Sequence, residues 1–215
     1  MPTFHEILTK KNADLLDRAR NHPFKSRIAS GAFSDALLDE WIEQEYLLVK
    51  DYQQFLSSLA GRAPGKIQKS VFESVINFHG EIELFEQFAT RKGVDLSRGK
   101  TNLARHSVGD FLLATVRFRS FPEAIAACYG TNLAHTEALS TMTRLHPSPG
   151  PWWDDFIDVR NQDSFVQFVD SLSNLADSVA EESSDETRGW MMESFRMAIQ
   201  YMLAYWDSLA GGAAT

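Results

Sequence analysis

The chain has 215 residues and a single cysteine, Cys128. One cysteine cannot form an internal disulfide, and its scarcity fits a reducing compartment. The sequence also lacks any run of about 18 apolar residues that could span a membrane. Its N-terminus lacks the basic segment and following apolar run of a secretory signal. These absences predict a soluble, cytoplasmic protein with no membrane partner.

Basic residues are outnumbered in this chain. Its 21 Lys and Arg residues against 29 Asp and Glu give a formal net charge of −8. A negative field repels phosphate groups, so we expect neither nucleic acid nor an anionic membrane as a partner. The hydrophobic content of 44% and charged content of 23% are ordinary for a globular protein.

Recognisable catalytic motifs are also absent. The chain has no glycine-rich phosphate loop, no paired-cysteine zinc spacing, no His-Glu-x-x-His and no Gly-x-Ser-x-Gly. His79 and Glu83 lie four residues apart, a helical spacing that could bind a metal. No second Glu-x-x-His element completes a di-iron site, so a solvated face is the favoured interpretation. We therefore expect no metal and no cofactor.

The apolar residues recur with a helical period along almost the whole chain. Helix-start patterns at Thr3 with Glu6 and at Ser120 with Glu123 have the form of capping boxes. No alternating β-branched run indicates a sheet. The expected helices cover roughly residues 3–21, 34–61, 66–92, 106–119, 121–145, 152–160, 165–179 and 185–210. We predict one all-α domain over residues 1–215, with seven to eight helices and a frayed tail at 211–215.

Glu45 is the most informative single residue. It lies on one apolar helix stripe with Leu38, Trp41, Leu48, Tyr52, Phe55 and Leu59. A carboxylate on a core-facing stripe needs a partner or a function. It is either a structural group at the stripe's edge, or bonded to a buried hydroxyl, or a ligand-binding or catalytic carboxylate inside a helical pocket.

A second mixed stripe runs along the helix expected over 121–145. Ala124, Cys128, Thr131, His135 and Met142 share one face there. A thiol, a hydroxyl and an imidazole on one face are compatible with nucleophilic chemistry. Small polar groups on a core helix also often bond only to backbone, and both interpretations stay open.

Four segments in order resemble the TenA (thiaminase II) family, which has the haem-oxygenase-like helical fold. The first holds His22-Pro23-Phe24, then Ser30-Gly31 and Trp41-Ile42-Glu43-Gln44-Glu45-Tyr46. The second is Phe121-Pro122-Glu123-Ala124-Ile125-Ala126-Ala127. The third is Trp152-Trp153-Asp154-Asp155-Phe156-Ile157 with Asp163-Ser164-Phe165, and the fourth runs from Phe195 through Tyr201 to Tyr205-Trp206. The resemblance covers nearly the whole chain.

The resemblance implies a pocket that holds a pyrimidine between aromatic side chains. Glu45 falls on the family's ring-orienting aspartate, Thr131 on its catalytic cysteine and Met202 on its proton-shuttling glutamate. Threonine is a weak nucleophile without a base, and methionine cannot move a proton. The implied substrate-binding residues are Leu48, His106, Trp153, Tyr201, Met202 and Tyr205. The proton mover is then His135 or His106, and Cys128 is either a displaced nucleophile or core packing.

Two functions follow from this resemblance. One is an aminopyrimidine hydrolase of thiamine salvage, and the alternative is a non-hydrolytic relative that binds a small heteroaromatic ligand or runs different chemistry in the same pocket. An iron-dependent oxidase is disfavoured, because residues 200–206 offer no carboxylate or histidine ligand. The expected partner is a small pyrimidine-like molecule. The resemblance also implies a homo-oligomer, either a dimer or a tetramer.

Overall fold

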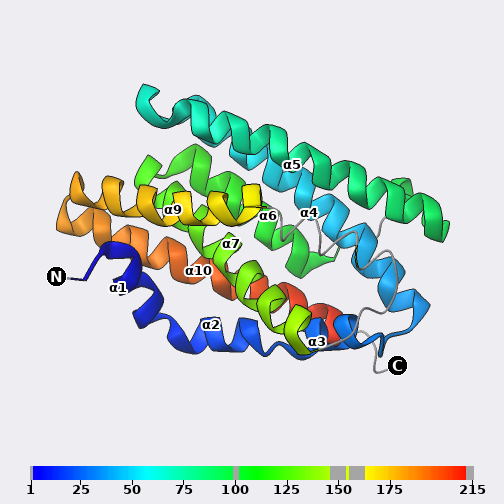
Figure 1. Ribbon diagram of the computed structural model, residues 1–215. Helices are drawn as coiled ribbons and strands as arrows, with labels where there is room; N and C mark the ends of the chain where they lie inside the picture. Colours follow the sequence, from blue (N-terminus) through cyan, green and yellow to red (C-terminus); the bar gives the residue numbers. More distant parts are fainter. Residues whose placement is uncertain (1, 99–101, 146–153, 155–162, 212–215) are drawn as a thin grey trace.

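The computed structural model describes residues 2–98, 102–145, 154 and 163–211. These residues form nine α-helices, one short 3-10 helix and no strand (Figure 1). The α-helices are α1 (Phe4–Lys11), α2 (Ala13–Arg20), α3 (Pro23–Ser30), α4 (Asp35–Arg62), α5 (Gly65–Lys92), α6 (Leu103–Phe118), α7 (Phe121–Leu145), α9 (Asp163–Glu181) and α10 (Asp185–Gly211), and the 3-10 helix is η1 (Leu96–Arg98). The prediction of an all-α fold is confirmed.

The N-terminal region contains more helices than the periodicity indicated. Asn12 divides the first expected helix into α1 and α2, and its side-chain amide donates a hydrogen bond of 2.8 Å to the Leu8 carbonyl. The segment between the helices expected over 3–21 and 34–61 contains α3, with Pro23 at its first position. Proline suits that position because it needs no N–H donor there. The helix expected at 152–160 falls, except for Asp154, outside the described residues.

Both predicted capping boxes are present. The Thr3 N–H donates to the Glu6 carboxylate at 2.8 Å, and the Glu6 N–H donates back to the Thr3 hydroxyl at 3.4 Å. Ser120 and Glu123 exchange the same two bonds at 3.0 and 3.4 Å. These bonds satisfy N–H groups that the first turn of a helix leaves without partners.

Helix α7 lies at the centre of the bundle and packs against α10, α2 and α9, while α5 covers the outer side of α4 (Figure 1). Gly130 allows the close approach of α7 and α10. A Cβ atom at this position would lie 2.6 Å from the Phe195 carbonyl oxygen. The buried apolar side chains form one continuous cluster, so the faces of α4, α7 and α10 that meet there define the interior.

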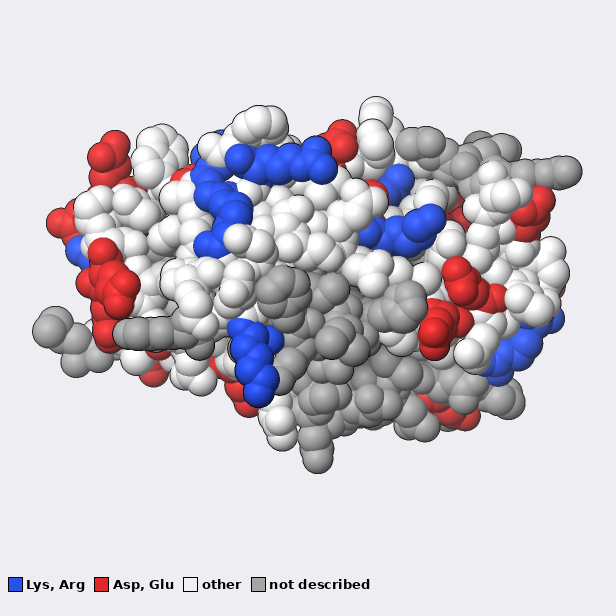
Figure 2. Space-filling view, turned by 90° about the horizontal axis from the view of Figure 1, so that it is seen from above, with Lys and Arg blue, Asp and Glu red and all other residues white. Residues whose placement is uncertain are grey.

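Charges of both signs lie on the face seen in Figure 2. Lys and Arg form separate groups there, and Asp and Glu gather toward the two ends. Among the described residues, no helix is long and apolar enough to cross a membrane.

His22 caps α3 from a buried position. The Phe24 N–H donates to its Nδ1 atom at 3.3 Å, and its Nε2 atom lies 3.1 Å from an Asp207 carboxylate oxygen. A nitrogen that accepts a backbone N–H cannot itself carry a proton, so the ring is held neutral. Burial lowers the pKa of His22 below its ordinary value of 6.5 and outweighs the opposing effect of Asp207.

This lowered pKa predicts a loss of stability in mild acid. Below a pH of about 6.5 the unfolded chain binds a proton at His22 more readily than the folded chain, so folding stability falls as the pH falls. His22→Gln removes this titration, and the variant should show a smaller drop in melting temperature between neutral and mildly acidic pH. His106→Gln, at an exposed position, serves as the control. An unchanged pH dependence in the His22 variant would contradict this account.

Candidate functional site

A small cavity lies among α4, α5 and α7. Its lining residues are Glu45, Leu48, Val49, Tyr52, Glu81, Thr131, Asn132 and His135. Its volume of about 20 Å³ is room for a single water molecule. Four of the nine residues predicted from the sequence meet here, namely Glu45, Leu48, Thr131 and His135.

Glu45 is a buried carboxylate with only 1% of its surface exposed. Its Oε1 atom accepts a hydrogen bond of 3.1 Å from the Trp41 indole N–H, one helical turn earlier on α4. The same oxygen lies 3.9 Å from the Lys25 ammonium, which comes from α3. No hydrogen bond to Oε2 from a described residue has a comparable geometry, although the Tyr205 hydroxyl on α10 interacts with this carboxylate. The carboxylate is therefore charge-compensated and keeps one oxygen available to a ligand.

Tyr205 on α10 lies beside this carboxylate. Burial and the nearby negative charge of Glu45 raise the pKa of Tyr205 well above its ordinary value. Its hydroxyl is fully buried and has no partner in hydrogen-bonding geometry among the described residues. The indole N–H of the adjacent Trp206 is also buried without a hydrogen-bond partner among the described residues. Two buried donors without partners are uncommon in a folded protein and mark this region as one that could bind polar groups.

The α7 wall of the cavity is a hydrogen-bonded polar cluster. The Thr131 hydroxyl donates to the Ala127 carbonyl at 3.0 Å, and the Asn132 amide donates to the Tyr52 hydroxyl. The Cys128 sulfur lies 3.1 Å from the same hydroxyl. Burial raises the pKa of Cys128 to about 12, so the thiol is protonated at neutral pH. A protonated thiol is a poor nucleophile.

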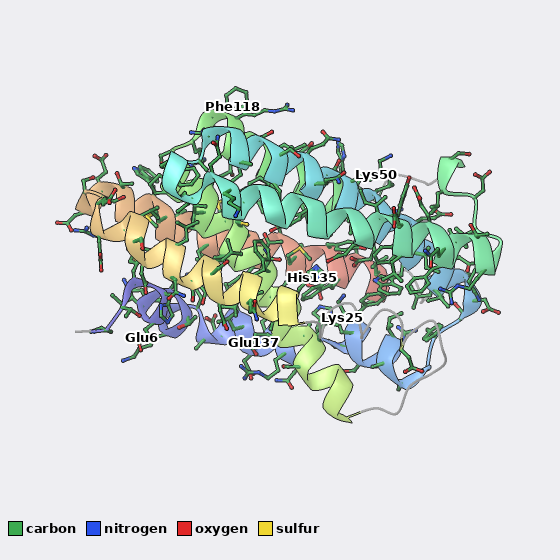
Figure 3. The ribbon with its side chains drawn as sticks, turned by 45° about the horizontal axis from the view of Figure 1, so that its top comes forward. Glu6, Lys25, Lys50, Phe118, His135 and Glu137 are labelled. Carbon is green, nitrogen blue, oxygen red and sulfur yellow. The ribbon has the colours of Figure 1, made fainter. Side chains whose placement is uncertain are left out.

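His135 and Lys25 lie against the same aromatic ring. The His135 ring meets Trp206 edge to face with centroids 5.4 Å apart, and the Lys25 ammonium lies 4.7 Å from the Trp206 ring centroid. Figure 3 labels both side chains in the interior of the bundle. His135 thus connects the cavity with the Lys25–Glu45 pair.

Five predicted residues lie elsewhere or outside the described part of the chain. Met202 is fully buried on α10, and Tyr205 lies beside Glu45, but neither lines the cavity. Tyr201 is only partly buried and stacks on Phe111 with centroids 4.9 Å apart. The His106 side chain points outward from α6 and is exposed. Its Nε2 atom lies 3.3 Å from an Asp110 carboxylate oxygen. Trp153 lies outside the described residues.

The sequence analysis missed two charged residues of this region. Lys25 is only 3% exposed, but it lies between the helices expected over 3–21 and 34–61, where the periodicity gave no reason to expect a buried charge. Glu81 is 4% exposed and lines the cavity from α5. A signal for Glu81 was present, since it lies three residues after Phe78 and four before Phe85 on one apolar stripe. Burial and the contact with Cys128 raise the pKa of Tyr52, and the charge of Glu81 adds to this effect.

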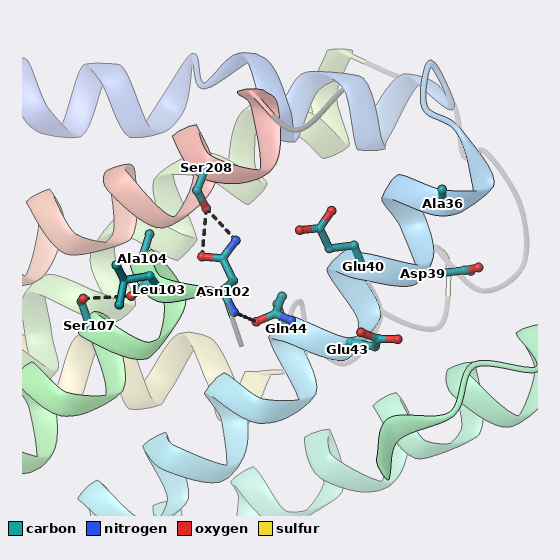
Figure 4. A pocket seen from close by; sticks show the side chains of 10 residues that line it. All are labelled: Ala36, Asp39, Glu40, Glu43, Gln44, Asn102, Leu103, Ala104, Ser107 and Ser208. Atoms are coloured by element: carbon teal, nitrogen blue, oxygen red, sulfur yellow. Dashed lines mark hydrogen bonds between the residues drawn. The ribbon is translucent and has the colours of Figure 1, made fainter. Parts of the chain in front are cut away.

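A larger open cleft of about 1080 Å³ lies among α4, α6 and α10 (Figure 4). Its wall carries the acidic residues Asp39, Glu40 and Glu43. Asn102 closes one side by hydrogen bonds to Gln44 at 3.3 Å and Ser208 at 3.0 Å. Size alone would favour this cleft, but it contains none of the predicted site residues. The buried cavity has the convergent polar groups expected of a binding site, and we take it as the candidate site.

Metal ligands do not converge in the described part of the chain. No group of three or more His, Cys, Asp or Glu side chains there is placed to hold a metal ion.

The arrangement of the helices matches a known fold. The chain superposes on a domain with a haem-oxygenase-like fold from Shewanella denitrificans with a TM-score of 0.75 at 13% identity, covering 97% of this chain and 92% of that one. The predicted haem-oxygenase-like fold is therefore confirmed. A TenA homologue from Pyrococcus furiosus superposes with a TM-score of 0.91 at 25% identity, covering 96% of this chain and 99% of the other.

Sequence comparison gives the family. The model of the TENA/THI-4/PQQC family matches residues 10–211, and the chain belongs to this family. It is 23% identical to a probable bifunctional TENA-E protein of Glycine max, over 96% of this chain and 93% of the relative. It is 21% identical to an aminopyrimidine aminohydrolase of Halalkalibacterium halodurans, over 95% of this chain and 94% of that enzyme.

The Lys25–Glu45 pair predicts a measurable coupling energy. Lys25→Met leaves a buried carboxylate without its cation and should lower the free energy of unfolding by about 3–5 kcal/mol. Adding Glu45→Gln to that variant should restore part of the loss, because no uncompensated charge then remains. Urea unfolding of the two single variants and the double variant measures the coupling. Strictly additive losses would show that the two side chains do not interact.

The buried thiol predicts slow alkylation. Because Cys128 is the only cysteine, a thiol reagent reports on it alone. The folded protein should react with iodoacetamide at least about a hundredfold more slowly than the same protein in urea. Burial blocks the approach of the reagent, and the high pKa lowers the fraction of thiolate. Rapid labelling of the folded protein would indicate an accessible, activated thiol.

Proposed function

We propose that this chain hydrolyses an aminopyrimidine and releases ammonia, as a step of thiamine salvage. The observation that carries the proposal is Glu45, a buried carboxylate that faces a polar cavity and keeps its Oε2 atom available. A carboxylate can accept a hydrogen bond from the amino group of such a heterocycle. The similarity to an aminopyrimidine aminohydrolase is further support. We also propose that the protein works in the cytoplasm as a homo-oligomer, a dimer or a tetramer.

Water is the nucleophile in this proposal. The Thr131 hydroxyl is engaged with a backbone carbonyl, and the high pKa of Cys128 keeps its thiol protonated. We assign proton transfer to Glu81, with His135 as the second candidate, because both line the cavity. The water oxygen forms a bond to the aminomethyl carbon as the carbon–nitrogen bond breaks. The proton that water gives to Glu81 then passes to the departing ammonia.

The substrate needs more room than the cavity provides. About 20 Å³ admits one water molecule and no pyrimidine ring. Binding therefore requires side chains of the lining to move. The side chains of Leu48 and Val49 are apolar and are not held by hydrogen bonds, so we expect them to shift before the polar wall of α7.

A second candidate is a relative that binds the heterocycle without hydrolysing it. The absence of an activated side-chain nucleophile among the described residues favours this alternative. Measurable pyrimidine binding by the purified protein without ammonia release would select it.

Hydrolysis predicts a clear pattern among three glutamate variants. Purified protein should release ammonia from amino-aminomethyl-methylpyrimidine. Glu45→Gln should abolish the release because it removes the ring-orienting charge. Glu81→Gln should lower kcat roughly a hundredfold or more with little change in KM, as expected when a proton-transfer group is lost. Glu83→Gln, at an exposed position of α5, is the matched control. Full activity in the Glu45 variant would refute the assignment.

A further inference from the structure

Lys25 is a charged side chain in the centre of an aromatic cluster. Its ammonium lies 4.7 Å from the Trp206 ring centroid and 5.9 Å from the Trp41 and Phe24 centroids. Burial of an ammonium is costly unless an anion and polarisable faces compensate it. Here Glu45 is the anion, at 3.9 Å. The cation is thus built into the region that recognises the ligand.

The Lys25–Glu45 pair offers a ligand a hydrogen-bond acceptor but carries no net charge. Trp41 and Lys25 both contact the Oε1 atom of Glu45, so a ligand donor can approach Oε2. A lone buried carboxylate would favour a protonated, cationic ring through charge attraction. A carboxylate already paired with an ammonium offers much less of that attraction, while it still accepts a hydrogen bond from a neutral amino group.

We propose that Lys25 is a specificity-determining residue, which makes the Glu45 end of the cavity select uncharged amino-heteroaromatic rings over protonated ones. The inference rests on the proposed function and names its substrate class. The proposed selectivity applies to the charge of the ring and not to the charge of its substituents. Glu81 lies near Tyr52, and Tyr52 follows Glu45 by two helical turns, a rise of about 10 Å along α4. A charged substituent on the ring can therefore lie away from the Lys25 ammonium.

Two probes of nearly the same shape test this proposal. The first probe, 4-aminopyrimidine, is mostly neutral at neutral pH. The second, 4-aminopyridine, has C–H in place of the ring nitrogen next to the amino-bearing carbon and is mostly protonated there. Isothermal titration gives the dissociation constant of each probe, and the ratio of the two constants is the readout. A ratio measured within one variant is insensitive to a partly unfolded fraction of that variant.

Charge variants should move this ratio in opposite directions. The unaltered protein should bind the neutral probe more tightly. Lys25→Met should shift the ratio toward the cation by roughly tenfold or more, while Lys25→Arg should keep the original preference. If Lys25→Met does not fold, Glu45→Gln supplies the opposite test, because its uncompensated ammonium should disfavour the cation further.

Lys50→Met is the matched control. The Lys50 ammonium lies 5.1 Å from the Tyr46 ring centroid, but its side chain is exposed on α4, away from Lys25 in Figure 3. This variant should leave the ratio unchanged.

The outcomes separate this inference from the proposed function. Tighter binding of the cation by the unaltered protein, or an unchanged ratio in both the Lys25→Met and Glu45→Gln variants, would overturn the role of Lys25. Aminopyrimidine hydrolysis by the unaltered protein could still stand in that case. No binding of either probe would instead count against the proposed function, and the inference would fall with it.

Discussion

The ion pair between Lys25 and Glu45 is the interaction on which the interior of this protein depends. Both side chains are almost completely buried, and neither charge would be tolerated there alone. The pair fixes α3 against α4, and the Trp206 ring beside Lys25 adds α10 to the same contact. Three helices therefore meet around two opposite charges. The arrangement also puts a ligand-accessible carboxylate oxygen where an all-apolar core would have none.

The surrounding packing limits how this site can change shape. Gly130 lets α7 pack directly against the α10 backbone, where a Cβ atom would lie 2.6 Å from the Phe195 carbonyl oxygen. The polar wall of α7 is held by hydrogen bonds of Thr131 and Asn132 to the carbonyls one turn earlier. Movement that admits a ligand is therefore expected on the side of α4 and α5. Glu81 lies on α5, so opening of the cavity on that side also moves the proposed proton-transfer group.

Much of the fold could be predicted from the sequence, and only part of the site. The apolar period of α4 placed Glu45 on an inward face, and α7 brought Thr131 and His135 to the same cavity. Lys25 could not be recognised, because its burial depends on α3, a short helix that begins with Pro23 where the apolar period predicted no helix. His106 could not be placed by spacing alone either, since only packing decides which side of α6 faces inward.

A crystal structure of the protein with a bound aminopyrimidine tests the central claim most directly. This account predicts that the ring lies between Glu45 and His135, with its amino group on Oε2 of Glu45 and with Leu48 displaced from its position in the unliganded protein. A ring bound instead in the open cleft beside Asp39 and Glu43, with the Glu45 cavity still closed, would contradict it.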